Sequence, residues 1–154
     1  MTNKCEIIER PAQLTLGIHT HSPVQDLGEL LPKTYQTVME YLAQIGQHPT
    51  GDPFAAYYNS DMQNLELDAG YLCTSKLPGK GNIQPGSIPG GKVASIVHVG
   101  PYPTMGDGYK ALNDWMAEKG YQSAGVYYEV YLNNPADTPP EALQTQIFTP
   151  LKTS

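Results

Sequence analysis

The segment GVYYEVYL (residues 125–132) has the composition of a central β-strand, because aromatic and β-branched residues dominate it. Its glycine and the Asn-Asn-Pro that follows predict turns at both ends. Side-chain alternation places Glu129 on the same face as Tyr127 and Tyr131. A buried carboxylate needs compensation, so Glu129 is our candidate functional residue. The alternative is an exposed face on which Glu129 is an ordinary surface charge.

The segments around this strand predict a regular order. A strand is expected at residues 93–99. A helix is expected at residues 104–119, with Leu112 and Met116 pointing inward. Gly120 is placed to end that helix. After the strand of Glu129, a polar turn leads to a last strand at 145–151.

The first part of the chain has the same order. Apolar residues recur every three or four positions from Leu27 to Ile45, which predicts a helix that Gly46 ends. Residues 5–20 are expected to form one long strand, interrupted near Pro11. Two further strands are expected at residues 54–58 and 65–72.

Matching segments in the two parts indicate an internal duplication. IHTHSP (18–23) corresponds to IVHVGP (96–101), and PFAAYY (53–58) corresponds to AGVYY (124–128). We therefore predict an α+β fold in which two tandem βαββ units form one antiparallel sheet of about eight strands. Both helices are expected on one face, with a ligand groove at the pseudo-twofold seam.

The chain is expected to be a single domain spanning residues 1–154. One half covers about 4–75 and the other about 92–152. The segment between them, at about 76–91, is rich in proline and glycine and is interpreted as a linker.

Composition excludes several classes of function. The net charge is −6, from 9 basic and 15 acidic residues, and no run of lysine or arginine provides a nucleic-acid or anionic-membrane surface. Cys5 and Cys73 lack paired spacing and are interpreted as free thiols. No signal peptide or bilayer-spanning segment is present in the sequence, so we expect a soluble, cytoplasmic protein.

Histidines offer weak evidence for a metal. His19 and His21 could share one strand face, but no carboxylate or cysteine stands at a companion spacing along the chain, so a solvated pair is expected. His98 is interpreted as a structural histidine. We expect neither a metal nor a cofactor.

Several motifs together resemble the GyrI-like small-molecule-binding domain, the effector domain of AraC-type and MerR-type transcription regulators. They are HVGPY (98–102), a helix with a tryptophan, YYEVYLNNP (127–135), IFTPL (147–151), DPFAAYYNSD (52–61) and LELDAGYL (65–72). The resemblance covers about residues 4–151 and implies the duplicated fold. The chain begins at once with its first strand, so it resembles a free-standing member without a DNA-binding segment.

The resemblance also implies a site. The family's pocket glutamate falls on Glu129, and its aromatic walls fall on Tyr102, Trp115, Tyr57 and Tyr127. Tyr71 lies where a symmetric pocket would place another aromatic ring. The implied function is binding of lipophilic aromatic, often cationic, drug-like or xenobiotic molecules, which a carboxylate and aromatic faces attract.

Two alternatives remain open. Free-standing relatives that this chain resembles hydrolyse cyclopropane-bearing genotoxic alkylators, which would make Glu129 a general base and the Tyr102 or Tyr127 hydroxyl a stabiliser of developing charge. The second is inhibition of DNA gyrase, from which the family takes its name. The acidic residues form no dense run, so we rank a protein partner third.

Overall fold

The computed structural model describes residues 4–152. The predicted antiparallel sheet and the two predicted helices are confirmed, and eight strands form the sheet in the order β1-β6-β8-β7-β3-β4-β2-β5. The chain divides into two compact units. We call Pro11–Gly90 the central unit, and the residues up to Arg10 and from Gly91 onward the terminal unit.

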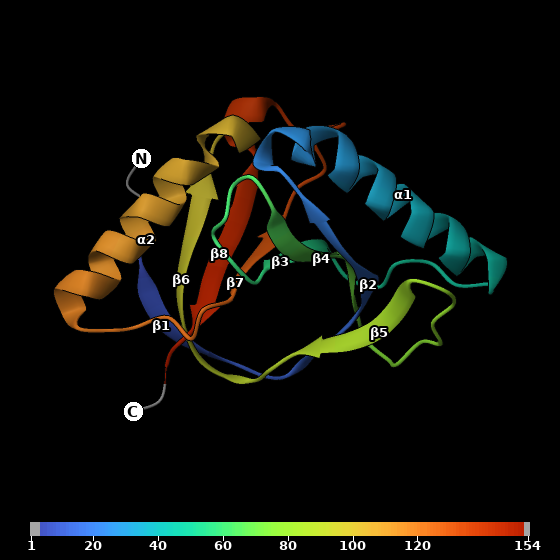
Figure 1. The fold of residues 1–154 in the computed structure, drawn as a ribbon, viewed down its shortest axis with the longest axis horizontal. Coiled ribbons are helices and arrows are strands. Elements are labelled where there is room, and N and C mark those ends of the chain that lie inside the picture. Colours follow the sequence, from blue (N-terminus) through green and yellow to red (C-terminus); the bar gives the residue numbers. More distant parts are fainter. Residues whose placement is uncertain (1–3, 153–154) are drawn as a thin grey trace. The chain divides into compact units, whose positions relative to one another are not determined.

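The terminal unit contains four antiparallel strands in the order β1-β6-β8-β7, with α2 packed against β6 (Figure 1). Leu112 and Met116 of α2 meet Ile96 and Ile147 of the sheet in one buried cluster. Its elements are β1 (Glu6–Arg10), β6 (Gly91–Val99), the 3₁₀ turn η2 (Tyr102–Thr104), α2 (Met105–Lys119), β7 (Tyr127–Tyr131), η3 (Pro140–Ala142) and β8 (Gln144–Pro150).

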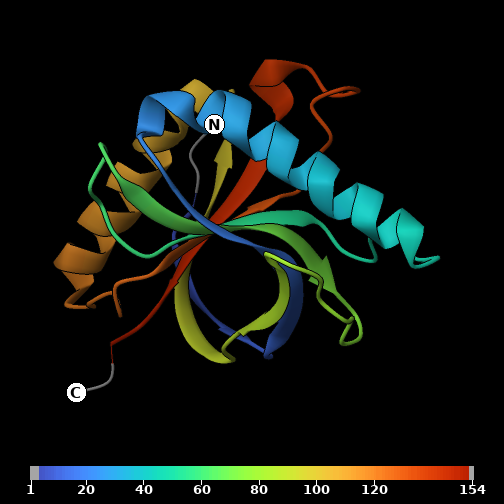
Figure 2. The same cartoon turned by 45° about the vertical axis from the view of Figure 1, so that its right-hand side comes forward.

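The central unit contains the strands β3-β4-β2-β5, also antiparallel, and α1 packs against β2 and β4. Figure 2 gives a second view of α1 beside these strands. Its elements are β2 (Gln13–Ser22), η1 (Val24–Asp26), α1 (Leu27–Gln44), β3 (Pro53–Tyr57), β4 (Leu65–Cys73) and β5 (Ile83–Ile88).

The helix ends lie where the glycines predicted them. Gly46 and Gly120 have φ angles of 73° and 80°, the left-handed conformation that glycine adopts without steric strain. The buried residues that alternate along β2 pack against the apolar stripe of α1. Together they form a core that contains Leu16, Ile18 and Leu42. The hydrophobic periods of β2 and α1 therefore set both the type and the buried face of these two elements.

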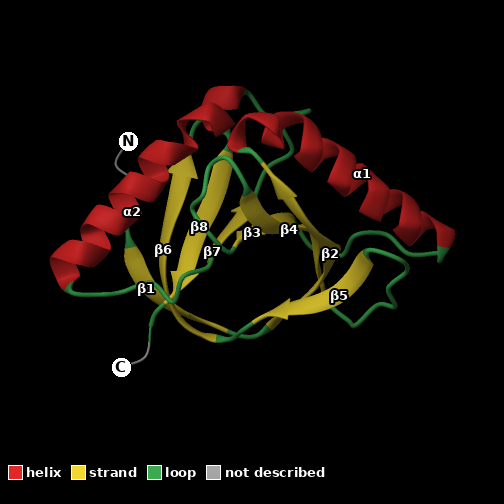
Figure 3. Cartoon of the chain, viewed as in Figure 1, coloured by secondary structure: helices red, strands yellow, loops and turns green. Residues whose placement is uncertain are grey.

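Two expectations about strands are wrong. Residues 5–20 do not form one interrupted strand, because β1 pairs with β6 in the terminal unit and β2 pairs with β4 and β5 in the central unit. The segment interpreted as a linker contains β5 (Figure 3). Pro85 lies in β5, which has β2 as its only neighbour in the strand order, and an edge strand tolerates a proline.

Candidate functional site

Glu129 lies in the middle of β7 and is 7 % exposed, so it is not an ordinary surface charge. Its partner across the ladder is Ile147 of β8, which belongs to the core cluster beneath α2. Glu129 therefore lies on the sheet face that α2 covers. Tyr128 and Val130 are buried on the other face, where the Tyr128 ring stacks on Phe148 with ring centroids 5.1 Å apart.

Two tyrosine hydroxyls hold the Glu129 carboxylate. The Tyr131 hydroxyl donates to Oε1 at 2.7 Å, and the Tyr109 hydroxyl donates to Oε2 at 2.5 Å. Tyr131 follows Glu129 by two residues, so alternation brings its side chain to the same face. Tyr109 comes from α2, so the helix and the sheet each supply one donor. Each carboxylate oxygen therefore has a hydrogen bond.

Burial is the dominant influence on the ionisation of Glu129. It raises the pKa of the carboxyl group, because the charged form is separated from water. The hydrogen bonds from Tyr109 and Tyr131 favour the charged form and oppose part of that rise. No lysine, arginine or histidine within residues 4–152 forms an ion pair with Glu129. The carboxylate is thus hydrogen-bonded without a positive counter-charge.

Four tyrosines surround this carboxylate, and we call Tyr102, Tyr109, Tyr127 and Tyr131 the tyrosine cluster. The Tyr102 and Tyr131 rings meet edge to face at 5.7 Å, and the Tyr109 and Tyr127 rings lie 5.6 Å apart at a tilt. Tyr102 is the most accessible member, at 38 % exposed. Burial is the main cause that raises the pKa of Tyr102, and the negative charge of nearby Glu129 raises it further.

Polar side chains border the tyrosine cluster. The Tyr127 hydroxyl donates to Asn113 Oδ1 at 2.5 Å, which ties β7 to α2 a second time. Thr145 faces Tyr131 across the ladder and is fully buried, and its hydroxyl lacks a hydrogen-bond partner among the described residues. His98 is buried and shares a hydrogen bond of 2.9 Å with the Thr104 hydroxyl.

The structure brings together three of the residues that the sequence singled out, Glu129, Tyr102 and Tyr127. Trp115 packs against the core beneath α2 and stacks on Tyr121. Tyr57 and Tyr71 lie in the central unit, where Tyr71 is buried beside Tyr35 of α1. A shared pocket that includes Trp115, Tyr57 and Tyr71 stays a prediction.

Sequence reasoning missed both donors to Glu129. Alternation along the strand predicts the correct face for Tyr131, but the sequence offers no sign that its hydroxyl contacts Glu129. Tyr109 follows Met105 by four positions and precedes Leu112 by three, so the helical period was the signal that could have placed it on the buried face of α2.

No helix within the described residues has the length and apolar character needed to cross a membrane. Both cysteines are free.

Solved structures with the same fold cover nearly all of this chain. The crystal structure of the EcmrR C-terminal domain matches with a TM-score of 0.80 and 17 % identity, over 100 % of both chains. A cryo-EM structure of EcmrR with DNA matches with a TM-score of 0.81 and 19 % identity over 99 % of this chain, which spans 58 % of that EcmrR chain.

Two further structures carry functional descriptions of their own. A hydrolase from Listeria innocua matches with a TM-score of 0.69 and 16 % identity, over 97 % of this chain and 92 % of that one. SAV2435 bound to tetraphenylphosphonium matches with a TM-score of 0.69 and 11 % identity, over 97 % and 94 %. At these identities the likenesses show the fold alone.

Among curated proteins, none matches this chain significantly. The family model for the GyrI-like small molecule binding domain matches residues 3–152. That match spans both helices and all eight strands, and it agrees with the architecture of the EcmrR C-terminal domain. The chain therefore belongs to the GyrI-like small-molecule-binding domain family.

Proposed function

We propose that this domain binds lipophilic aromatic cations, with Glu129 as the anionic anchor. The observation that carries the proposal is a buried carboxylate that has two tyrosine donors and no positive partner among residues 4–152. Desolvation has already disfavoured its charge, so an incoming cation supplies the missing counter-charge without a further large desolvation of Glu129.

The tyrosine cluster favours a flat or globular aromatic ligand. A cation within about 6 Å of a tyrosine ring gains about 0.5–2 kcal/mol, depending on how well water is excluded. Tyr102 is partly exposed and meets Tyr131, the donor to Glu129. A delocalised charge suits this environment, because it has less hydration to lose than a compact ammonium.

Related proteins support this ligand class. The family is a small-molecule-binding one, and a structure of the same fold, SAV2435, is bound to tetraphenylphosphonium. We therefore choose tetraphenylphosphonium as the test cation. Tetraphenylborate is the matched control, because it has the same shape and the opposite charge.

Isothermal titration calorimetry tests the proposal directly. The wild-type protein should bind tetraphenylphosphonium and reject tetraphenylborate. Glu129→Gln should weaken cation binding by about 1–3 kcal/mol, which corresponds to about 5–150-fold. Glu118→Gln, on the exposed surface of α2, is the control and should bind like the wild type. Equal binding of both ions, or wild-type cation affinity in Glu129→Gln, would contradict the proposal.

A second candidate function is hydrolysis of cyclopropane-bearing alkylators. Two observations favour it: a raised pKa brings the Glu129 carboxyl nearer to the range of a useful general base, and a structure of the same fold is described as a hydrolase. In this alternative Glu129 takes a proton from water, and the water oxygen bonds to a cyclopropane carbon. The ring carbon–carbon bond breaks, and its electron pair moves to the dienone oxygen, which the Tyr102 hydroxyl stabilises.

Turnover separates the two candidates. If Glu129 is a general base, Glu129→Gln should leave binding of a neutral alkylator nearly unchanged and lower its turnover by about two to four orders of magnitude. Tyr102→Phe should lower turnover without abolishing it. Release of ring-opened product by the wild type at the rate of the protein-free control would exclude the hydrolase candidate.

A further inference from the structure

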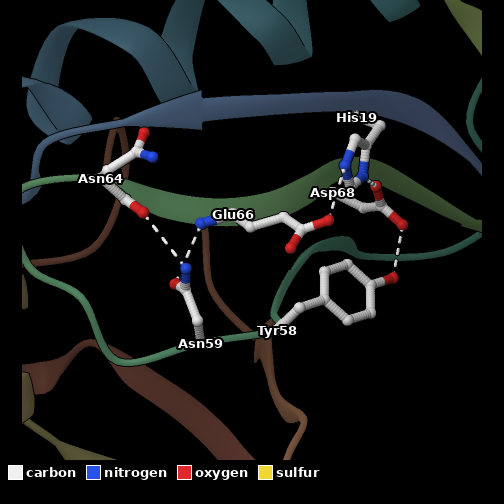
Figure 4. Close-up of polar contacts among 6 residues, drawn as sticks. All are labelled: His19, Tyr58, Asn59, Asn64, Glu66 and Asp68. Atoms are coloured by element: carbon white, nitrogen blue, oxygen red, sulfur yellow. Dashed lines mark hydrogen bonds and ion pairs between the residues drawn. The ribbon is translucent and has the colours of Figure 1, made fainter.

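The central unit carries a second polar cluster, on the sheet face opposite to α1. His19 and His21 are exposed on β2, while the alternating residues Leu16 and Ile18 are buried toward the helix. Glu66 and Asp68 are their direct partners across the β2–β4 ladder. We call His19, His21, Glu66 and Asp68 the histidine–carboxylate cluster, and Figure 4 shows three of its members.

Three groups in this cluster converge like metal ligands. His19, His21 and Glu66 each have one ligand atom that lies within 4.8 Å of the ligand atoms of the other two residues. His19 Nε2 and Glu66 Oε2 are 3.1 Å apart. A tetrahedral zinc site with bonds of about 2.0–2.1 Å separates its ligand atoms by about 3.3 Å, so this pair already has nearly the required spacing.

The other nitrogen of His19 is oriented for this role. Its Nδ1 lies 2.6 Å from Asp68 Oδ1, and because a carboxylate only accepts, Nδ1 carries the proton and donates it. A metal binds the neutral form of imidazole, and in that form the proton on Nδ1 leaves the lone pair on Nε2, the nitrogen beside Glu66 Oε2. The Tyr58 hydroxyl donates to the second oxygen of Asp68 at 2.5 Å and fixes that carboxylate (Figure 4).

This chain of contacts is the arrangement found around zinc-bound histidines, in which an outer carboxylate sets the tautomer and ring orientation. The backbone at Glu66 is also anchored, because its N–H donates to Asn59 Oδ1 at 3.0 Å (Figure 4). Two carboxylates share the cluster with the two imidazoles, and their negative charge attracts a cation.

A hollow adjoins the cluster. Its volume is about 230 Å³, and His19 and Asp68 contribute to its wall together with Gly17, Phe54 and Gln84. His19 and Glu66 side chains are 50 % and 41 % exposed, so an ion can reach them directly from solvent. Three protein ligands leave a fourth position for water or a small exchangeable ligand.

We propose that His19, His21 and Glu66 bind a divalent transition metal of the Zn²⁺ class, with Asp68 and Tyr58 as positioning residues. Imidazole and carboxylate together suit Zn²⁺ and Co²⁺, whereas Mg²⁺ and Ca²⁺ prefer oxygen ligands alone. The site lies in the central unit and uses none of the residues assigned to cation binding at Glu129. The two proposals therefore fail or succeed separately.

Equilibrium dialysis of the full chain, freed of any polyhistidine tag and treated with chelator, tests the site with Zn²⁺. We expect one ion per chain, and Co²⁺ in its place should give the intense visible absorption of a tetrahedral complex. His19→Ala, His21→Ala and Glu66→Gln should each lower Zn²⁺ affinity at least tenfold. Asp68→Asn should lower it by about 10–100-fold while the tetrahedral Co²⁺ spectrum persists, which distinguishes positioning from direct ligation.

The matched control is His48→Ala, because His48 is an exposed histidine of the same unit outside the cluster. It should bind Zn²⁺ like the wild type, and so should Glu129→Gln. Circular dichroism of each variant confirms that the fold is retained. The proposal is overturned if the wild type binds no Zn²⁺ at millimolar concentration, or if His48→Ala weakens binding as much as His19→Ala does.

Discussion

Within residues 4–152, Glu129 is compensated by hydrogen bonds but not by an ion pair. Burial raises the pKa of its carboxyl group, and the hydroxyls of Tyr109 and Tyr131 reduce that rise. A carboxyl group whose pKa is higher in the folded protein than in the unfolded chain makes the fold less stable as the pH rises between those two values. The wild-type protein therefore retains an electrostatic penalty at neutral pH, which a bound cation would relieve.

Glu129→Gln should remove this penalty. The amide keeps the shape and a hydrogen-bond acceptor, so we expect equal or greater stability at neutral pH and a smaller fall in stability as the pH rises above about 4.5, the ordinary value. Urea unfolding at several pH values measures the difference, with Glu118→Gln as the exposed control. A steeper loss of stability in Glu129→Gln than in the wild type would contradict the interpretation.

Removing a donor should have the opposite effect. Tyr131→Phe leaves Oε1 of a buried carboxylate without its hydrogen bond, which should destabilise the fold by about 1.5–3 kcal/mol and raise the pKa of Glu129 further. The loss should shrink when Glu129→Gln is also present, because a neutral amide needs its partners less. Tyr121→Phe, at a ring that stacks on Trp115, provides the comparison in the same unfolding assay.

Helix α2 can hold Tyr109 over Glu129 because Gly108 brings it close to the sheet. A Cβ atom on Gly108 would lie 2.9 Å from Ile147 Cδ1 and 3.1 Å from His98 Cβ. Ile147 is the ladder partner of Glu129, so the closest approach of the helix falls beside the site. Gly106, two residues earlier, has open space around it.

These two glycines form a matched pair. Gly106→Ala should stabilise the protein by about 0.4–1 kcal/mol, because alanine restricts the unfolded chain. Gly108→Ala should destabilise it by about 1–3 kcal/mol through overpacking, and should weaken tetraphenylphosphonium binding by displacing Tyr109. Thermal unfolding and calorimetry measure both. If the two substitutions had the same sign, the close approach at Gly108 would not limit the packing of α2.

The elements that the sequence predicted correctly have a clear local signal. The stripe from Leu27 to Ile45 identifies the buried face of α1, whereas the aromatic and β-branched composition identifies β7, which is buried on both faces. Strand β5 lacks such a signal, because IQPGSI buries only its end residues Ile83 and Ile88. Its pairing comes from β2, and a register between distant segments is not encoded in the local pattern.

The same limit applies to the candidate sites. The carboxylate Glu129 stood out in the sequence because its own neighbours are apolar, whereas Glu66 stands out only once β4 is aligned with β2. That alignment places Glu66 opposite His21 and Asp68 opposite His19, almost fifty residues away along the chain. Spacing along one strand therefore revealed the two histidines but not their carboxylate partners.

The two units are not consecutive halves of the chain, because the terminal unit combines residues from both ends of the sequence. Strand β1 joins the terminal unit by pairing with β6, where Glu6 aligns with Ser95 and Arg10 with Gly91. Ile7 packs against the core beneath α2, and the Arg10 guanidinium lies 4.0 Å from the centre of the Phe148 ring. The first strand thus supports the sheet that carries Glu129, although residues 11–90 separate them.

Deleting residues 1–10 should therefore weaken the terminal unit first. The loss of Ile7 burial and of the Arg10 contact predicts a destabilisation of about 2–5 kcal/mol. Hydrogen exchange followed by mass spectrometry should show reduced protection in β6 and β8 before β2 and β4.

Arg10→Ala alone should reproduce about 0.5–2 kcal/mol of the loss in stability, whereas Glu9→Ala, at an exposed neighbour in the same strand, should change the stability by no more than about 0.5 kcal/mol. Equal or earlier loss of protection in β2 and β4 would mean that β1 stabilises the whole chain at once rather than the unit that contains Glu129.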